Sequence, residues 1–402
     1  MQIKWAPYPW VCFSMCVGVM GTALASPLYP LYQTAWQLQT SDITLVYAIY
    51  MAGAMLSLLM LGSLSDRYGF VRVLRLGLIV VTAGSLLSAV SWNYASFAVA
   101  RLLVGLASGM ITTSASVGLT QLNNTGDLQR AAATTSLTIA FGFGLGPVLG
   151  GVIAQWVPAP LVSAYVPSLA LGVLAIVSLG RIGQHMPTPV SNAPVAAAHW
   201  LPQITLPAPG LRLRYVLAGM CAFLAFGMFS LYASLAPSFM AQMVPWHGPA
   251  VSGVALGMIL FLSAGFQFLS RSMGSRWCAL AGLGALGVSL LVLLLNTYLN
   301  SSLLFVLSVL TAALGHGLCN IGGMSVVNRL ADAHNRSGLI ATYLVIGYIG
   351  SMLPIMVLGW MADHLGLATA LPLYCAAMSA LIAWVLWSIY RLPPVAPSQA
   401  AA

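Results

Sequence analysis

Acidic residues are almost missing from this chain of 402 residues, which has five aspartates and no glutamate, and charged residues make up only 5% of it. Hydrophobic residues make up 60%. A soluble domain carries charge on roughly a quarter or more of its surface residues, so this composition excludes a water-soluble protein. It indicates an integral membrane protein.

Cysteine is also scarce and is not arranged for metal binding. The six cysteines lie in apolar stretches without a Cys-x-x-Cys pair, at positions 12, 16, 221, 278, 319 and 375. We interpret them as small apolar helix residues and expect neither a disulfide framework nor a metal site. No nucleophile or phosphate-binding loop occurs at a useful spacing, which argues against an enzyme, and no cofactor is expected.

The basic residues indicate how the chain crosses the membrane. Thirteen of the 14 fall in alternate gaps between apolar stretches, in seven groups: Lys4; Arg67, Arg72 and Arg75; Arg130; Arg181, Arg212 and Arg214; Arg271 and Arg276; Arg329 and Arg336; and Arg391. Lysine and arginine accumulate on the cytoplasmic side of a bilayer, so we predict an even number of spans with both termini cytoplasmic. The lipid bilayer accounts for the net charge of +9 without a nucleic-acid partner.

The apolar stretches predict an all-α protein with 12 transmembrane helices in two pseudo-symmetric six-helix bundles. A helical span needs about 20 apolar residues. The stretches that meet this length are 8–32, 43–62, 74–92, 95–121, 131–155, 161–181, 213–241, 250–270, 277–296, 302–328, 338–361 and 368–390. The N-terminus resembles a secretory signal with a cleavage site before Ser26, but the apolar run continues past Pro27 and supplies the first span of an even topology.

A proline-rich segment divides the spans into six and six. It predicts an N-terminal bundle over residues 1–181, a cytoplasmic linker rich in proline and alanine over 182–211, a C-terminal bundle over 212–391 and a cytoplasmic tail over 392–402. Asp127 and Arg130 before the fifth span are echoed by Asp332 and Arg336 before the eleventh. Duplicated halves of this kind recur in transporters.

The loop after the second span carries the most specific motif. Residues 62–72 read Gly-Ser-Leu-Ser-Asp-Arg-Tyr-Gly-Phe-Val-Arg. This segment resembles the G-x-L-x-D-R-x-G-R-[RK] motif of the major facilitator superfamily, although Phe70 stands where that family has a basic residue. The alternative is an ordinary basic loop. The resemblance implies a gating motif made of Gly62, Asp66, Arg67, Gly69 and Arg72.

Two further motifs strengthen the resemblance. Arg101 is followed by Gly105 and Gly109 on one helical face. This pattern is similar to the fourth-helix motif that the superfamily links to proton coupling. The alternative is that the Arg101 side chain extends to the membrane surface. The fifth span matches the core motif of the superfamily's proton-coupled exporters of drugs and metabolites, in a segment that also predicts close helix packing and a bend. Its motif residues are Gly142, Gly146, Pro147, Gly150 and Gly151.

In the superfamily the substrate cavity is lined by the first, fourth, seventh and tenth spans. The resemblance therefore makes cavity candidates of the polar and aromatic residues there: Thr22, Ser26, Tyr29, Thr112, Thr113, Ser116, Tyr232, Ser234 and Asn320. No carboxylate is among them, which favours neutral or anionic cargo over cations. The candidates for proton coupling are Arg101, His316 and Asp42, although His316 has a structural alternative and Asp42 can simply cap its helix behind Ser41.

We therefore expect a secondary active transporter in the bacterial cytoplasmic (inner) membrane, working by alternating access. The expected partners are a small-molecule substrate and protons as the coupling ion, and the expected oligomeric state is a monomer. Proton-coupled efflux is the favoured direction. The alternatives are an uptake carrier, an uncoupled facilitator, or a membrane receptor or scaffold that transports nothing.

Overall fold

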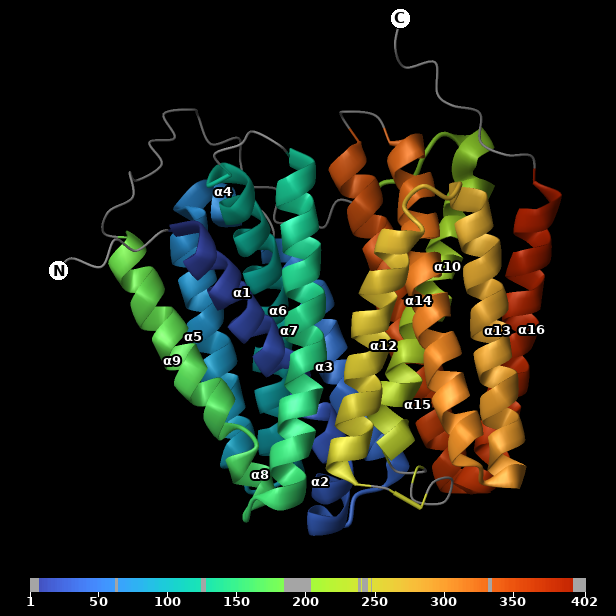
Figure 1. Ribbon diagram of the computed structural model, residues 1–402, viewed down its shortest axis with the longest axis horizontal. Coiled ribbons are helices and arrows are strands. Elements are labelled where there is room, and N and C mark those ends of the chain that lie inside the picture. Colours follow the sequence, from blue (N-terminus) through green and yellow to red (C-terminus); the bar gives the residue numbers. More distant parts are fainter. Residues whose placement is uncertain are drawn as a thin grey trace, which may run out of the picture. The chain divides into compact units, whose positions relative to one another are not determined.

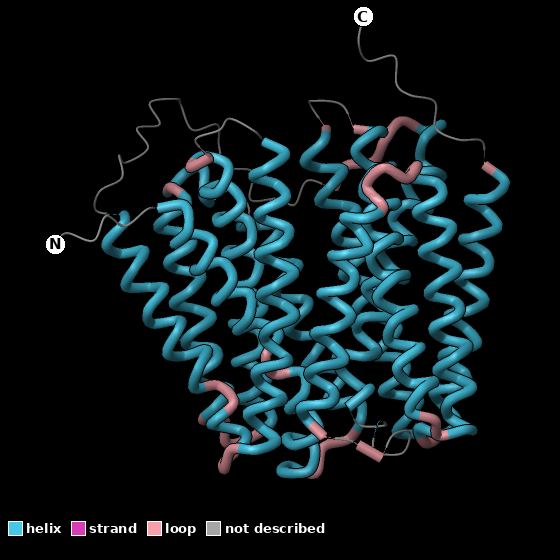
Figure 2. The backbone as a smooth tube through the Cα atoms, in the orientation of Figure 1, coloured by secondary structure: helices cyan, strands magenta, loops and turns pink. Residues whose placement is uncertain are grey.

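The computed structural model describes residues 7–61, 64–123, 128–183, 204–237, 240, 245–246, 248–331 and 335–392. Within these ranges every regular element is helical (Figures 1 and 2). The α-helices are α1 (Pro7–Ala23), α2 (Tyr29–Trp36), α3 (Thr40–Leu61), α4 (Leu64–Tyr68), α5 (Phe70–Ala89), α6 (Tyr94–Gln121), α7 (Leu128–Trp156), α8 (Pro160–Ser163), α9 (Val166–Gly183), α10 (Arg212–Ser230), α12 (Pro249–Leu269), α13 (Ser275–Leu299), α14 (Ser302–Leu330), α15 (Arg336–Leu365) and α16 (Leu367–Arg391). Two 3₁₀ segments, η1 (Ser26–Leu28) and η2 (Pro209–Leu211), and one π-helical segment, η3 (Leu231–Leu235), complete them.

Twelve spans are confirmed within the described part of the chain. Each is long and apolar enough to cross a bilayer, and their ends lie within a few residues of the predicted limits in most cases. The first span runs from Pro7 to Trp36, past its predicted end at residue 32, and is interrupted between α1 and α2. Pro27 and Pro30 explain the interruption, since a proline ring removes a backbone donor and obstructs the preceding turn.

The contacts of the chain form two compact units. The first unit comprises residues 1–37, 49–202 and 249–257, and the second comprises residues 38–48, 203–248 and 258–402. Each unit thus contains most of one half of the sequence and the first part of one helix from the other half, namely α12 for the first unit and α3 for the second.

In the first unit, the glycines of α7 allow close contact with two neighbouring segments. A Cβ atom at Gly142 would lie 2.7 Å from the carbonyl oxygen of Cys16, and one at Gly150 would lie 2.7 Å from that of Leu24, so this face of α7 packs directly on α1. A Cβ atom at Gly151 would overlap the carbonyl of Pro249, at the start of α12. At these glycines of α7 there is no room for a larger side chain unless the neighbouring segment moves.

The second unit repeats this arrangement with α15. A Cβ atom at Gly350 would overlap the carbonyl of Phe223 in α10, and one at Gly359 would overlap the side chain of Thr44, near the start of α3. Pro354 lies inside α15 as Pro147 lies inside α7. The two units thus use a glycine-lined helix with an internal proline in equivalent ways.

The core of the first unit lies among α1, α5, α6 and α9, around Met15, Leu78 and Ile111. In the second unit a core cluster joins α10, α14 and α15 around Tyr215, Val327 and Tyr343. Outside these cores the helices carry many exposed leucine, valine, phenylalanine and tryptophan side chains. Such a surface is stable only in contact with lipid.

Candidate functional site

Arg101 is the most unusual side chain of the first unit. It lies on α6 and is only 1% exposed. Its Nη1 atom donates a hydrogen bond of 3.2 Å to the carbonyl oxygen of Thr22, and its guanidinium stacks 4.3 Å from the ring centroid of Tyr50. The alternative of an arginine extended to the membrane surface is not what the structure has, because the side chain points into the unit.

The guanidinium keeps unused hydrogen-bonding capacity. Nε and Nη2 of Arg101 have no hydrogen-bond partner among the described residues. The hydroxyl of Tyr29 lies near the guanidinium without hydrogen-bond geometry to it or to another described residue. No acidic side chain that the structure describes belongs to this unit. A buried, permanently charged group with unpaired donors is stabilised when a hydrogen-bond acceptor binds to them.

The glycines that follow Arg101 hold α6 against α3. A Cβ atom at Gly105 would overlap the carbonyl of Tyr50, and one at Gly109 would lie 2.7 Å from the hydroxyl of Ser57. These close contacts bring Tyr50 over the guanidinium. The predicted single face of Arg101, Gly105 and Gly109 is therefore real, and it also builds the cation–π contact.

Four other predicted cavity residues of the first unit have hydroxyl groups that are satisfied locally. Thr22 and Ser26 are buried, and the hydroxyl of Thr22 donates to the carbonyl of Val19. Thr112, Thr113 and Ser116 are partly buried and donate to carbonyls of Ser108, Gly109 and Thr112 in their own helix. Hydroxyls bonded in this way compete little for cargo, so within this group Arg101 and Tyr29 keep the larger capacity for binding.

The loop motif is only partly described. Gly62 and the side chain of Asp66 lie outside the described residues. The exposed Arg67 lies over the Tyr68 ring at 5.3 Å, and Arg72 is exposed on α5. Gly69 has a φ of 81° in the turn between α4 and α5, a conformation that only glycine adopts without strain. The gating role of the motif stays a prediction.

In the second unit, His316 lies within a polar cluster. Its Nδ1 atom is 2.8 Å from the hydroxyl oxygen of Ser263, which also accepts from the amide of Gln267 at 3.3 Å. The Asn320 amide donates to the backbone carbonyl of His316 at 2.9 Å and lies 3.3 Å from Nε2 of the ring. Because the serine hydroxyl can rotate, it can serve either a neutral or a protonated imidazole.

Aromatic rings surround this cluster. Phe226 stacks on the His316 ring with centroids 6.2 Å apart, and the ring of Phe229 lies at 5.9 Å. Tyr348 meets Phe226 edge-on. All of these side chains are partly exposed, in contrast to Arg101. A partly exposed patch of rings with hydrogen-bonding groups suits a planar, polar ring system.

Tyr232 and Ser234 lie elsewhere in the second unit. Both are buried in the π-helical segment η3, where the Tyr232 hydroxyl bonds to Ser308 at 2.9 Å and Ser234 bonds to the carbonyl of Ser230. These contacts favour a packing role. The π-helical turn adds a residue per turn and so changes which side chains face the interior, which periodicity at 3.6 residues does not reveal.

Asp42 lies at the start of α3 and accepts the backbone N–H of Gln39 at 2.9 Å, as its helix-capping alternative predicts. A residue that the sequence did not point to lies beside it. The carboxylate of Asp363, on α15, accepts the backbone N–H groups of Thr40 and Ser41 at 2.9 and 3.0 Å. Asp363 thereby caps the first turn of α3 from another helix.

The sequence also did not indicate that Tyr50, Ser263, Gln267 and the two phenylalanines at His316 belong to the candidate sites. Ser263 and Gln267 are one helical turn apart inside an apolar span, a signal that could have drawn attention to that face of α12. Among the described residues, no three His, Cys, Asp or Glu side chains are grouped to hold a metal ion.

Curated relatives resemble part of the chain. The riboflavin transporter RibZ of Clostridioides difficile strain 630 is 23% identical over 179 residues, which are 44% of this chain and 38% of RibZ. The quinolone resistance protein NorA of Staphylococcus aureus is 26% identical over 168 residues, 41% of this chain and 42% of NorA. The matched part thus spans about two fifths of the length of these relatives.

Solved structures resemble nearly the whole chain. A bacterial homolog of the human lysosomal transporter Spinster, in an inward-facing and occupied conformation, has a TM-score of 0.73 at 12% identity and 97% coverage of both chains. A POT family transporter in complex with 5-aminolevulinic acid has a TM-score of 0.77 at 11% identity, over 94% of this chain and 95% of its own. At such identities the likeness shows the fold alone.

A family model described as Major Facilitator Superfamily matches residues 11–271, which is more than half of the chain. This match agrees with the 12 spans and with the fold of the solved transporters. The chain therefore belongs to the major facilitator superfamily.

Proposed function

We propose that this transporter moves a small neutral or anionic organic compound across the bacterial cytoplasmic membrane by alternating access, as a monomer and by proton-coupled export. The buried Arg101, with Nε and Nη2 unbonded and no described acid in its unit, is the single observation that carries the choice of cargo. A fixed positive charge in a low-dielectric setting favours a carboxylate and disfavours a cation.

The cluster around His316 supports an aromatic cargo. Its rings and its neutral hydrogen-bonding groups match a flat heterocycle with polar edges. The names of the two curated relatives are in keeping with this, since one transports riboflavin and the other confers quinolone resistance, and both compounds are planar heterocycles. Export is the direction that the resistance protein suggests.

The orientation in this proposal follows the basic residues, with both termini and the segment around Pro194 in the cytoplasm. Cysteine tags at these positions, labelled from either side of the membrane, test it. Labelling of the segment around Pro194 from outside would contradict the orientation.

Uptake of labelled compounds into inverted membrane vesicles tests the proposal. The compounds are riboflavin, a quinolone, and a matched pair made of an aromatic carboxylate and its primary amide. Each is measured with an imposed proton gradient and again after the gradient is collapsed. We expect accumulation of at least one compound only with the gradient, and no accumulation of an aromatic amine cation.

Arg101→Gln separates the anionic from the neutral cargo. A hydrogen bond to a charged group contributes about 1.5–3 kcal/mol, so the KM of the carboxylate should rise about 10- to 100-fold in the variant. The KM of the amide should change little. Arg391→Gln, an exposed arginine stacked on Trp387, is the matched control and should leave both unchanged. Equal loss of both compounds, or a preference for the cation, would remove Arg101 from cargo selection.

An uncoupled facilitator is the second candidate. It is favoured by one observation: in the described part of the chain, the acids Asp42 and Asp363 both serve as backbone caps at the start of α3, and none lies mid-span. Equal rates with and without the proton gradient would select this alternative.

A further inference from the structure

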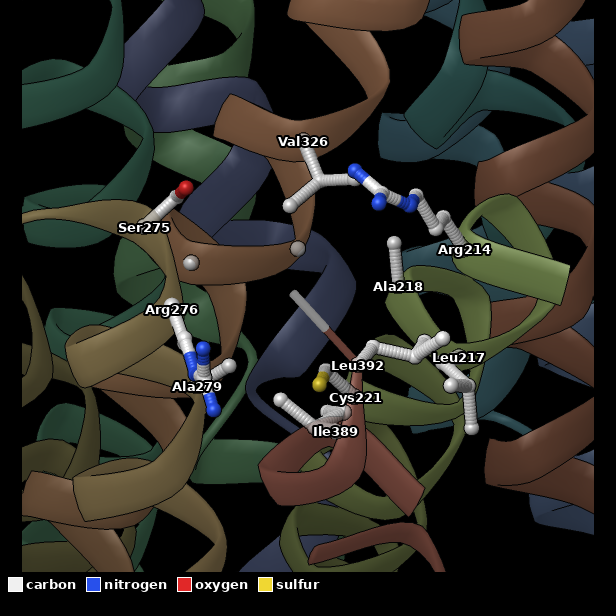
Figure 3. Close-up of a pocket in the computed structure, with 12 residues that line it drawn as sticks. Arg214, Leu217, Ala218, Cys221, Ser275, Arg276, Ala279, Val326, Ile389 and Leu392 are labelled. Carbon is white, nitrogen blue, oxygen red and sulfur yellow. The ribbon is translucent and has the colours of Figure 1, made fainter. Parts of the chain in front are cut away.

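A recess opens at one end of the second unit, and none of its lining residues belongs to the polar cluster around His316. It lies between the first turns of α10 and α13 and the final turns of α14 and α16 (Figure 3). It is partly open to solvent. Its lining includes Arg214, Leu217, Cys221, Arg276, Val326 and Ile389.

Two arginines carry the charge of the recess. Arg214 and Arg276 are both partly buried. Nη2 of Arg276 donates to the carbonyl oxygen of Tyr390 at 2.6 Å, which anchors this side chain to the end of α16. Arg214 forms no hydrogen bond or ion pair with any residue that the structure describes, and in Figure 3 its guanidinium points toward Val326. Each arginine lies in the first turn of its helix, where the helix dipole adds positive potential.

The depth of the recess is apolar. Leu217, Ala218 and Ile389 line it, and the sulfur of the buried Cys221 faces it (Figure 3). Cys221 follows Arg214 by seven residues along α10, which corresponds to about 10 Å. A ligand that matches both the positive charge of the arginines and the apolar depth has an anionic end and an apolar body.

The position of the recess relative to the bilayer is marked by aromatic side chains. Trp277 is 65% exposed directly after Arg276, and Trp387 and Tyr390 are 51% and 64% exposed on the last turns of α16. Exposed tryptophan and tyrosine rings gather at the level of the lipid headgroups. The arginines of the recess therefore lie at the level of lipid phosphates.

We propose that this recess binds an anionic phospholipid, with Arg214 holding the phosphate, Arg276 adding positive charge to the lining and the apolar depth taking part of the acyl region. Basic pockets between transmembrane helices bind the headgroups of anionic lipids. The lipid phosphate is favoured over free phosphate because the depth is apolar and because the mouth lies at the headgroup level. The proposal does not depend on the cargo.

The purified full-length protein in detergent tests the proposal. Thermal unfolding and native mass spectrometry are measured with added phosphatidylglycerol, phosphatidylcholine or inorganic phosphate. We expect phosphatidylglycerol to bind and to raise the unfolding midpoint, and the other two to do so much less. Arg214→Gln should weaken phosphatidylglycerol binding about fivefold, because one basic residue near a lipid surface contributes about that much.

Arg271→Gln is the matched control, because Arg271 lies on the turn before α13, is exposed and stacks on Phe268 at 4.4 Å, outside the recess. It should retain the affinity of the wild type, and Arg214→Lys should retain most of it. Equal binding of phosphatidylcholine would overturn the proposal, as would an equal effect of inorganic phosphate, which would identify a free anion instead. Equal losses in Arg214→Gln and Arg271→Gln would reduce the effect to general surface charge.

Discussion

Gly146→Ala is expected to destabilise the first unit and to impair transport. A Cβ atom at position 146 would overlap the carbonyl oxygen of Met20 and lie 3.2 Å from the backbone nitrogen of Leu24. Because carbon and oxygen atoms approach to about 3.3–3.6 Å in close helix contacts, α1 and α7 would have to separate by about 1 Å. Overpacking of this kind costs about 1–3 kcal/mol.

The same separation has a functional consequence. Met20 is two residues before Thr22, whose carbonyl accepts the 3.2 Å hydrogen bond from Arg101. A shift of about 1 Å would break a hydrogen bond that is already long. Gly146→Ala should therefore lower the transport rate of the folded protein and should raise the KM for an anionic cargo.

Gly284→Ala supplies the control for this prediction. Gly284 lies inside α13, and a Cβ atom there meets nothing within 4 Å. Alanine is better than glycine in a helix by about 0.8–1 kcal/mol, so this variant should be slightly more stable than the wild type. Thermal unfolding in one detergent, together with transport per folded molecule, compares the two. A Gly146→Ala protein as stable and as active as Gly284→Ala would refute the close contact between α1 and α7.

Three other variants test separate parts of the molecule. Gly69→Ala should destabilise the protein by about 1–3 kcal/mol, since the φ of 81° at this position strains any residue other than glycine. Gly274 has a φ of −60°, so Gly274→Ala should be neutral in the same unfolding assay. His316→Gln should abolish gradient-driven accumulation but retain cargo binding, because the amide keeps a bond to Ser263 but takes up no proton. His364→Gln, on the exposed end of α15, is the control. A wild-type pH profile in His316→Gln would remove this histidine from coupling. Asp363→Asn should lower stability by about 1 kcal/mol more than Asp42→Asn, because it weakens two backbone caps between helices rather than one within a turn, and equal unfolding midpoints would refute that role.

Much of the fold could be predicted because the bilayer imposes it. Helices satisfy their own hydrogen bonds in lipid, so apolar stretches of the right length identify the spans. The glycine spacing in the fifth span also predicts a close-packed face. The sequence does not say which neighbour meets that face, and the contacts of Gly142 with α1 and of Gly151 with α12 come only from the structure.

The candidate sites were less predictable, because they depend on which direction each side chain takes. The sequence identified Arg101 as an arginine in an apolar span but not its contacts with Thr22 and Tyr50, which come from other helices. It identified His316 as an isolated histidine, whereas Ser263, more than fifty residues earlier, is its hydrogen-bonding neighbour. Long-range pairs of this kind are set by packing and leave no local pattern in one sequence.

The contrast between Arg101 and His316 suggests how charge is balanced in the proposed cycle. The guanidinium of Arg101 is always charged, and an arginine inside a span costs about 2.5–3.5 kcal/mol on insertion scales. Under the proposed function, a bound carboxylate would supply the acceptor that Nε and Nη2 lack. His316 can exchange a proton, and the rotatable hydroxyl of Ser263 can serve both states of its ring. Charge selection of cargo and proton binding are thus assigned to different residues, which explains why Arg101→Gln should change the KM for the anion while His316→Gln should change the response to the gradient.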